Sequence, residues 1–195
     1  MKNMVISPKL VRALPPEVGT WFRRWAEFMY QHVEFGLPES KIHGMGHCER
    51  VLLYALMLGV EEFDGDEKAL EVLAHAAVFH DSRREEEGRD TGHGARAAEY
   101  YEEYCKEHPE LVYRPEAACV MRYHDRNDQL GETAITEAFG HDAPLVCALY
   151  RVFKDADALD RWRLGPRALN LNYLRTDRAA ALAGFSRKMV ALTTV

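Results

Sequence analysis

The apolar residues of the chain recur mostly three and four positions apart, which is the spacing of an amphipathic α-helix. This spacing predicts helices over about residues 16–35, 47–58, 67–81, 91–106, 115–124, 144–159 and 172–192. The alternation of apolar and polar residues that is typical of half-buried strands is nearly absent. We therefore expect an all-α, single-domain helical bundle over residues 1–195, with an N-terminal helix within 1–40 and a C-terminal helix within 165–195.

Composition and charge narrow the class of protein. Hydrophobic residues make up 47% of the chain and charged residues 29%, as in an ordinary globular domain. A net charge of -6 argues against a nucleic-acid partner. No apolar run reaches the roughly 20 residues of a membrane span, and the N-terminus lacks the apolar core of a signal peptide. Four scattered cysteines without a CxxC pair indicate reduced thiols, so we expect a cytoplasmic protein.

Four of the predicted helices carry a metal-ligand type of side chain within a row of apolar residues. The rows are His47 with Val51, Ala55 and Leu58; His80 with Leu70, Leu73 and Ala77; His124 with Ala117 and Met121; and Asp155 with Ala148, Val152 and Leu159. Histidine and aspartate are uncommon in a helical core unless a partner offsets the cost of removing them from water. A shared divalent cation is such a partner, so the rows predict a buried metal site.

The adjacent pair His80-Asp81 lies where the third helix is expected to end, before the polar segment 82–90. Neighbouring helical residues point about 100° apart, but both reach one ion if it lies beyond the helix end. The predicted ligands are His47, His80, Asp81 and Asp155. Mixed imidazole and carboxylate ligands suit Mn, Fe, Co, Ni or Zn, and Mg less well. Four such ligands leave positions open for water and a substrate oxygen.

These residues resemble the motifs of the HD-domain phosphohydrolases, across about residues 46–160. The similar segments are HCERV (His47–Val51), HD (His80-Asp81) followed by Arg84, DTGHG (Asp90–Gly94), YH (Tyr123-His124) and KDADALD (Lys154–Asp160). The bare HD dipeptide carries no weight, because it also occurs at His124-Asp125 and His141-Asp142. The ordered set is specific. The resemblance implies an all-α fold, a divalent metal ion on the four predicted ligands, and hydrolysis of a phosphoester or phosphoanhydride.

Three residues are predicted to be catalytic. Asp81 shapes the charge that activates the metal-bound water. His93 follows a glycine at an expected helix start, where backbone N–H groups favour an anion, so it either holds a substrate phosphate or acts as general acid. Asp90 is either a proton-transfer partner or the N-cap of the same helix.

Four further residues are predicted to bind the substrate. Arg84 and Lys154 are candidate phosphate clamps, because cationic side chains match phosphate oxygens. His124 either contacts phosphate or, together with His93, binds a second metal ion. Asp160 is placed at the border of the pocket.

The favoured function is a metal-dependent phosphohydrolase acting on a small phosphorylated metabolite, with a nucleotide as the preferred class. One alternative is a di-iron oxygenase of the same scaffold, whose ligand order is H…HD…H…H…D. The chain reproduces that order with His47, His80-Asp81, His93, His124 and Asp155. The other alternative is a non-catalytic nucleotide-binding module. Neither nucleic acid nor a membrane is an expected partner, and the oligomeric state stays open, with a homodimer as one option.

Overall fold

The computed structural model describes residues 4–194, and over this range it contains helices and no strands. The helices are α1 (Pro8–Arg12), α2 (Pro16–His32), α3 (Met45–Glu62), α4 (Glu67–Phe79), α5 (His93–Glu107), α6 (Pro115–Tyr123), α7 (Asp128–Phe139), α8 (Ala143–Leu159) and α9 (Asp177–Thr193). Short 3-10 helices lie at η1 (Gly140–Asp142), η2 (Asp160–Leu164) and η3 (Leu171–Tyr173). The predicted all-α fold class is confirmed.

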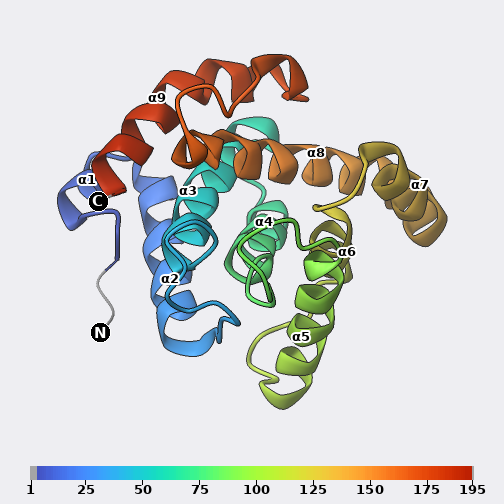
Figure 1. Ribbon diagram of the computed structural model, residues 1–195. Coiled ribbons are helices and arrows are strands. Elements are labelled where there is room, and N and C mark those ends of the chain that lie inside the picture. The colour runs from blue at the N-terminus through green and yellow to red at the C-terminus, as the bar shows by residue number, and fades with distance from the viewer. Residues whose placement is uncertain (1–3, 195) are drawn as a thin grey trace.

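Helix α3 lies at the centre of the molecule, and α2, α4, α8 and α9 pack around it (Figure 1). Its middle segment, residues 51–56, is completely buried. A helix that is apolar on all sides is stable only inside a core. One hydrophobic core extends from Ile6 to Met189 and includes residues of most helices. The site described below therefore rests in part on this buried central helix, which carries His47.

The predicted helix end at residue 58 is wrong, because α3 continues through Gly59 to Glu62. Gly59 instead allows α4 to approach, because a Cβ at this position would meet the side chains of Leu73 and Leu70. The glycine therefore serves close helix packing. A different glycine does stand at a helix boundary: Gly92 has a φ of 100° and precedes His93, the first residue of α5. This left-handed conformation favours glycine and sets the direction in which His93 enters the core.

Two elements near the C-terminal half differ from the prediction. Helix α7 was not expected; among its residues only Gly131 and Ile135 are buried, so its apolar row is too sparse to indicate a helix. Helix α9 begins at Asp177 instead of 172, because the side chain of Thr176 caps it by accepting a hydrogen bond from the backbone N–H of Ala179. Short helix α1 was also not predicted. Within residues 4–194, no helix is long and apolar enough to cross a membrane.

Candidate metal centre

Five elements bring histidine and aspartate side chains to one buried point. His47 lies in the first turn of α3, and His80-Asp81 directly follows α4. Asp157 lies in the last turns of α8. His93 begins α5, and His124 directly follows α6. Because most of these residues stand at helix ends, their side chains reach a common centre that no single helix face would provide.

The first group of candidate ligands consists of His47, His80 and Asp157, with Asp81 beside them. His47 Nε2 lies 3.2 Å from His80 Nε2, 3.3 Å from Asp157 Oδ1 and 3.5 Å from Asp81 Oδ2. The ligand-type atoms of His47, His80 and Asp157 all lie within 4.8 Å of one another, close enough to share one ion. The structure thus brings together three of the predicted ligands, His47, His80 and Asp81.

A second group forms on the other oxygen of Asp81. Its Oδ1 lies 3.0 Å from His93 Nε2 and 3.7 Å from His124 Nε2, and the two Nε2 atoms are 2.9 Å apart. His80, Asp81 and His124 also meet the distance condition for a shared ion. Asp81 therefore stands between two histidine pairs, with one carboxylate oxygen toward each.

The four imidazole rings are oriented in the same way, with Nδ1 facing outward. Nδ1 contacts an oxygen in each case: Asp160 Oδ2 at 2.8 Å from His47, the Ala77 carbonyl at 2.9 Å from His80, the Asp90 carbonyl at 2.5 Å from His93, and the Met121 carbonyl at 2.7 Å from His124. Carbonyl and ionised carboxylate oxygens accept hydrogen bonds, so Nδ1 carries the proton and Nε2 of the neutral ring offers a lone pair. Metal-binding histidines are held in this manner.

This orientation tests whether the residues fit a metal ion. Two neutral rings repel when their Nε2 lone pairs face each other, unless a proton or a cation lies between them. The Nε2 atoms are 3.2 Å apart in the pair His47 and His80, and 2.9 Å apart in the pair His93 and His124. Asp81 and Asp157 supply negative charge at the same place. The donor set therefore fits divalent cations of the transition-metal type, and its two histidine pairs provide for a second ion as well as a first.

The protonation states of His80, Asp81 and Asp157 agree with that fit, whereas His124 must release a proton to bind an ion. Burial lowers the pKa of His80 to about 3, which keeps its ring neutral. Burial alone raises the pKa of Asp81 and of Asp157, but nearby histidines outweigh this effect and lower both pKa values. For Asp81 these are His80 and other histidines, and for Asp157 they are His47 and His80. Burial lowers the pKa of His124, yet the contact with Asp81 outweighs it and raises the pKa. Ionised carboxylates and a neutral imidazole are the forms that bind metal.

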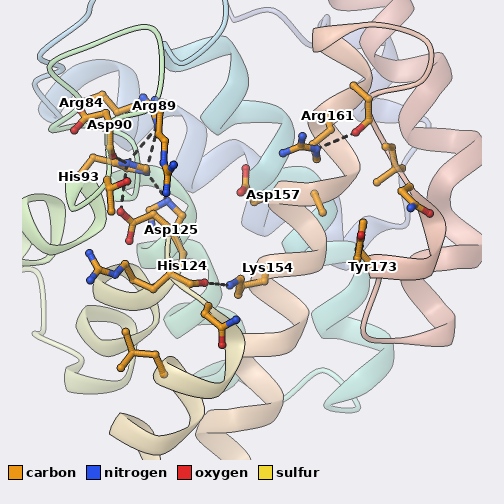
Figure 2. A pocket seen from close by; sticks show the side chains of 18 of the residues that line it. Arg84, Arg89, Asp90, His93, His124, Asp125, Lys154, Asp157, Arg161 and Tyr173 are labelled. Atoms are coloured by element: carbon orange, nitrogen blue, oxygen red, sulfur yellow. Dashed lines mark hydrogen bonds and ion pairs between the residues drawn. The ribbon is translucent and has the colours of Figure 1, made fainter.

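The centre opens on one side into a cavity of about 940 Å³. His47, Asp81, His93 and His124 are at most 8% exposed in their side chains, whereas the side chain of Asp157 is 34% exposed. Asp157, His93 and His124 line the cavity, and Figure 2 shows Asp157 between the two sides of the opening. A ligand in the cavity therefore reaches the centre from the side of Asp157.

Asp155, a predicted metal ligand, is not part of this centre. Its carboxylate is completely buried and accepts hydrogen bonds from the backbone N–H of Arg175 at 2.9 Å, and from the backbone N–H and Oγ1 of Thr176, both at 2.9 Å. It thereby fixes the segment that leads into α9. Asp157 takes the place predicted for Asp155, because two residues along a helix turn the side chain by roughly 200° to the other face.

The difference between the two aspartates yields a matched pair of variants. We expect Asp157→Asn to weaken metal binding by at least about tenfold, since it removes a charged ligand. Asp155→Asn should leave the bound metal unchanged and lower the free energy of unfolding by about 1–3 kcal/mol, because a buried acceptor of several hydrogen bonds is replaced by an amide. Elemental analysis and denaturant unfolding of both variants measure these effects. Loss of metal in Asp155→Asn alone would restore the original ligand assignment.

Two other predicted site residues have supporting contacts. Asp160 does not border the cavity; it is completely buried behind His47, and accepts hydrogen bonds from Arg50 Nε at 2.6 Å and Nη2 at 2.9 Å. Asp90 lines the cavity, but both of its oxygens accept hydrogen bonds from Arg96 at 2.7 Å. This pairing fixes the loop before α5 and favours a structural role for Asp90 over proton transfer. Asp90 is not the predicted N-cap, because Gly92 occupies that position and α5 has no side-chain cap.

The two predicted phosphate clamps line the cavity and differ in their surroundings. Arg84 is buried, with Nη1 3.9 Å from Asp81 Oδ1 and 3.3 Å from His93 Nδ1. Its Nε is buried without a hydrogen-bond partner in the described part of the chain. Lys154 Nζ is held by Asp128 at 2.6 Å and by the Arg126 carbonyl at 2.6 Å. Arg84 is thus close to the centre, whereas Lys154 is already bound by protein groups.

Two residues of the site, Asp157 and His43, are not among the ligands predicted from the sequence. Asp157 belongs to the same KDADALD segment as Asp155, so this segment is the signal that could have located it. His43 precedes α3, and its Nδ1 lies 3.1 Å from Asp81 Oδ2. The His141-Asp142 dipeptide, by contrast, is exposed in η1, which agrees with its dismissal as a chance match.

Comparison of the chain with protein-family models, with curated proteins and with solved structures finds no match in any of the three.

Proposed function

We propose that the protein is a metal-dependent phosphohydrolase of the HD-domain type that acts on a small phosphorylated metabolite, with a nucleotide as the favoured class. The observation that carries the proposal is the carboxylate of Asp81, which lies between the pairs His47/His80 and His93/His124 at the end of an open cavity. Hydrolysis of a phosphoester requires an acidified water and a neutralised phosphate, and both requirements are met where divalent ions adjoin a cavity.

The chain's own residues would divide the work in the following way. His47, His80, Asp81 and Asp157 would hold one divalent ion, and Asp81, His93 and His124 a second. When bound, such ions lower the pKa of a water and polarise a phosphoryl oxygen. Outward hydrogen bonds on Nδ1 keep the ring orientations fixed, and Asp160 with Arg50 supports His47 from behind. Arg84, 3.9 Å from Asp81, orients an anionic substrate at the centre.

The charge of the cavity supports an anionic substrate. The chain as a whole has a net charge of -6, yet among the residues that line the cavity six are Arg or Lys and three are Asp. A cleft of positive charge in an acidic protein concentrates anions near the site. The overall acidity disfavours a polynucleotide, so a small phosphorylated molecule fits best.

The proposal is tested by release of inorganic phosphate from nucleotides and sugar phosphates in the presence of Mn, Co, Ni or Mg. We expect release from at least one substrate, its loss on addition of a chelator, and its recovery when the metal is restored. Metal-loaded protein that binds a phosphorylated compound and releases no phosphate from any would instead support a non-catalytic binding module.

The second group of ligands also favours a second candidate, a di-iron oxygenase. His93 Nε2 and His124 Nε2, 2.9 Å apart beside Asp81, complete the H…HD…H…H…D order of that enzyme class, with Asp157 as the last aspartate. The positive cavity favours the hydrolase, because phosphate needs cationic partners. Oxygen consumption by the iron-loaded protein, without phosphate release, would decide for the oxygenase.

A further inference from the structure

Apart from Arg84, the cations that line the cavity fall into two kinds. Lys154 and Arg175 both contact Asp128, at 2.6 Å from Lys154 Nζ and 2.8 Å from Arg175 Nε, and Arg175 Nη1 also lies 3.2 Å from Asp155 Oδ1. Arg89, Arg126 and Arg161 are exposed, and within residues 4–194 none of them lies within 4.0 Å of a carboxylate oxygen. We call these three the arginine rim. Lys154 and Arg175 are thus paired with acidic groups, whereas the three arginines have no acidic partner in the described residues. Of these three, Arg161 donates a 3.0 Å hydrogen bond from Nε to the Ala168 carbonyl.

The arginine rim is assembled from separate parts of the chain. Arg89 lies in the loop before α5, Arg126 in the turn between α6 and α7, and Arg161 in η2. Figure 2 shows Arg89 beside Arg84 and Asp90, and Arg161 on the other side of Asp157. The positive charges therefore surround the opening to the metal centre instead of forming a surface run along one helix.

Arg84 links the rim to the metal centre. Its Nη1 lies 3.9 Å from Asp81, while its Nη2 donates a 2.7 Å hydrogen bond to the Gly88 carbonyl, next to Arg89. The Arg84 side chain is only 7% exposed, and its Nε lacks a partner in the described part of the chain. Arg84 therefore extends from the metal centre to the loop that carries Arg89.

Apolar side chains also line the cavity. Tyr173 is 75% exposed and Leu130 is 47% exposed, and both line the cavity together with Ala168 and Leu169. Exposed large apolar side chains beside a charged opening are typical of a site that also contacts an organic group. The volume of about 940 Å³ exceeds what a single phosphate needs and is in the range of pockets for larger organic ligands.

We propose that the arginine rim is a second anion subsite, and that the substrate carries two or more phosphates joined to an organic group. One phosphate lies at the metal centre, the others lie against Arg89 and Arg126, and the organic group packs on Tyr173 and Leu130. The subsite deepens the phosphohydrolase proposed above and rests on it for the phosphate at the metal centre. Arginine suits this role because its planar guanidinium binds phosphate oxygens in pairs.

The test compares the double variant Arg89→Ala/Arg126→Ala with the control Arg167→Ala. Arg167 is also exposed and forms no ion pair within residues 4–194, but it does not line the cavity. Inorganic tripolyphosphate and orthophosphate are titrated into metal-free protein by calorimetry. We expect the double variant to bind tripolyphosphate at least about tenfold more weakly than wild type, as for loss of charge-assisted hydrogen bonds. The control should stay within about twofold, and orthophosphate should bind far more weakly to wild type than tripolyphosphate.

Phosphate release from adenosine triphosphate and adenosine monophosphate by the Mn-loaded proteins separates the two proposals. A raised KM for the triphosphate alone in the double variant supports the subsite. Equal KM values in wild type and double variant, or equal weakening by Arg167→Ala, would overturn the subsite while leaving the phosphohydrolase intact. Absence of phosphate release with selective tripolyphosphate binding would overturn the phosphohydrolase and support the subsite as an anion-binding site.

Discussion

Asp81→Asn is expected to abolish phosphate release, with a loss of at least about 10³-fold, while the protein stays folded. Asp81 is the carboxylate that faces both histidine pairs, so its neutralisation removes ligand charge from both ion positions at once. A metal ion contributes several kcal/mol of charge stabilisation in the transition state, and about 1.4 kcal/mol corresponds to a tenfold change in rate. Steady-state phosphate release and elemental analysis measure the effect.

The control for Asp81→Asn is His141→Asn, which alters the exposed histidine of an HD dipeptide outside the site. This variant should retain wild-type activity and metal. Circular dichroism of both variants should show the helical content of the wild type. Wild-type turnover in folded Asp81→Asn would exclude Asp81 from the catalytic centre.

His124→Ala is expected to lower the number of bound divalent ions from two to one per chain. His124 Nε2 belongs to the group with His93 and Asp81, whereas His47 and Asp157 lie in the other group. We expect phosphate release to fall by about 10²-fold or more, because one of the ions that neutralise the substrate is lost. Elemental analysis of wild type and variant side by side provides the count, and an unchanged count would assign His124 to the substrate instead of the metal.

The same histidine predicts a pH dependence. Contact with Asp81 raises the pKa of His124 above its ordinary value, so in metal-free protein a proton competes with the ion for Nε2. Metal binding must release that proton, and affinity at this position should fall by about tenfold per pH unit below the pKa of His124. In His124→Ala the second binding step, and the proton release that accompanies it, should both be absent. Calorimetry in buffers of different ionisation enthalpy measures the proton release.

The helical period predicted which side chains are buried more reliably than it predicted which residues those side chains contact. The rows through His47 and His80 led to the metal centre because both residues stand at helix ends that point inward. The row through Asp155 was equally apolar, and Asp155 is indeed buried, but against Arg175 and Thr176. Helix α8 is buried on two faces, and a one-dimensional period does not say which of them adjoins the other ligands.

The loops and helix ends were harder to predict than the helices. The role of Asp90 depends on Arg96, six residues away on α5, and the role of Asp160 depends on Arg50, which is 110 residues away. Such pairings follow from tertiary packing and leave no local pattern in the sequence. The arginine rim likewise has no local pattern in the sequence, because Arg89, Arg126 and Arg161 are far apart along the chain and share only the cavity that they line.

The most direct test of the metal centre is a crystal structure of the Mn-loaded protein with anomalous scattering data. We predict one anomalous peak bound by His47, His80, Asp81 and Asp157, and a second bound by Asp81, His93 and His124. Ligand atoms should lie about 2.0–2.3 Å from the ions. Absence of both peaks at full Mn loading, or a peak coordinated by Asp155 without Asp157, would contradict the account.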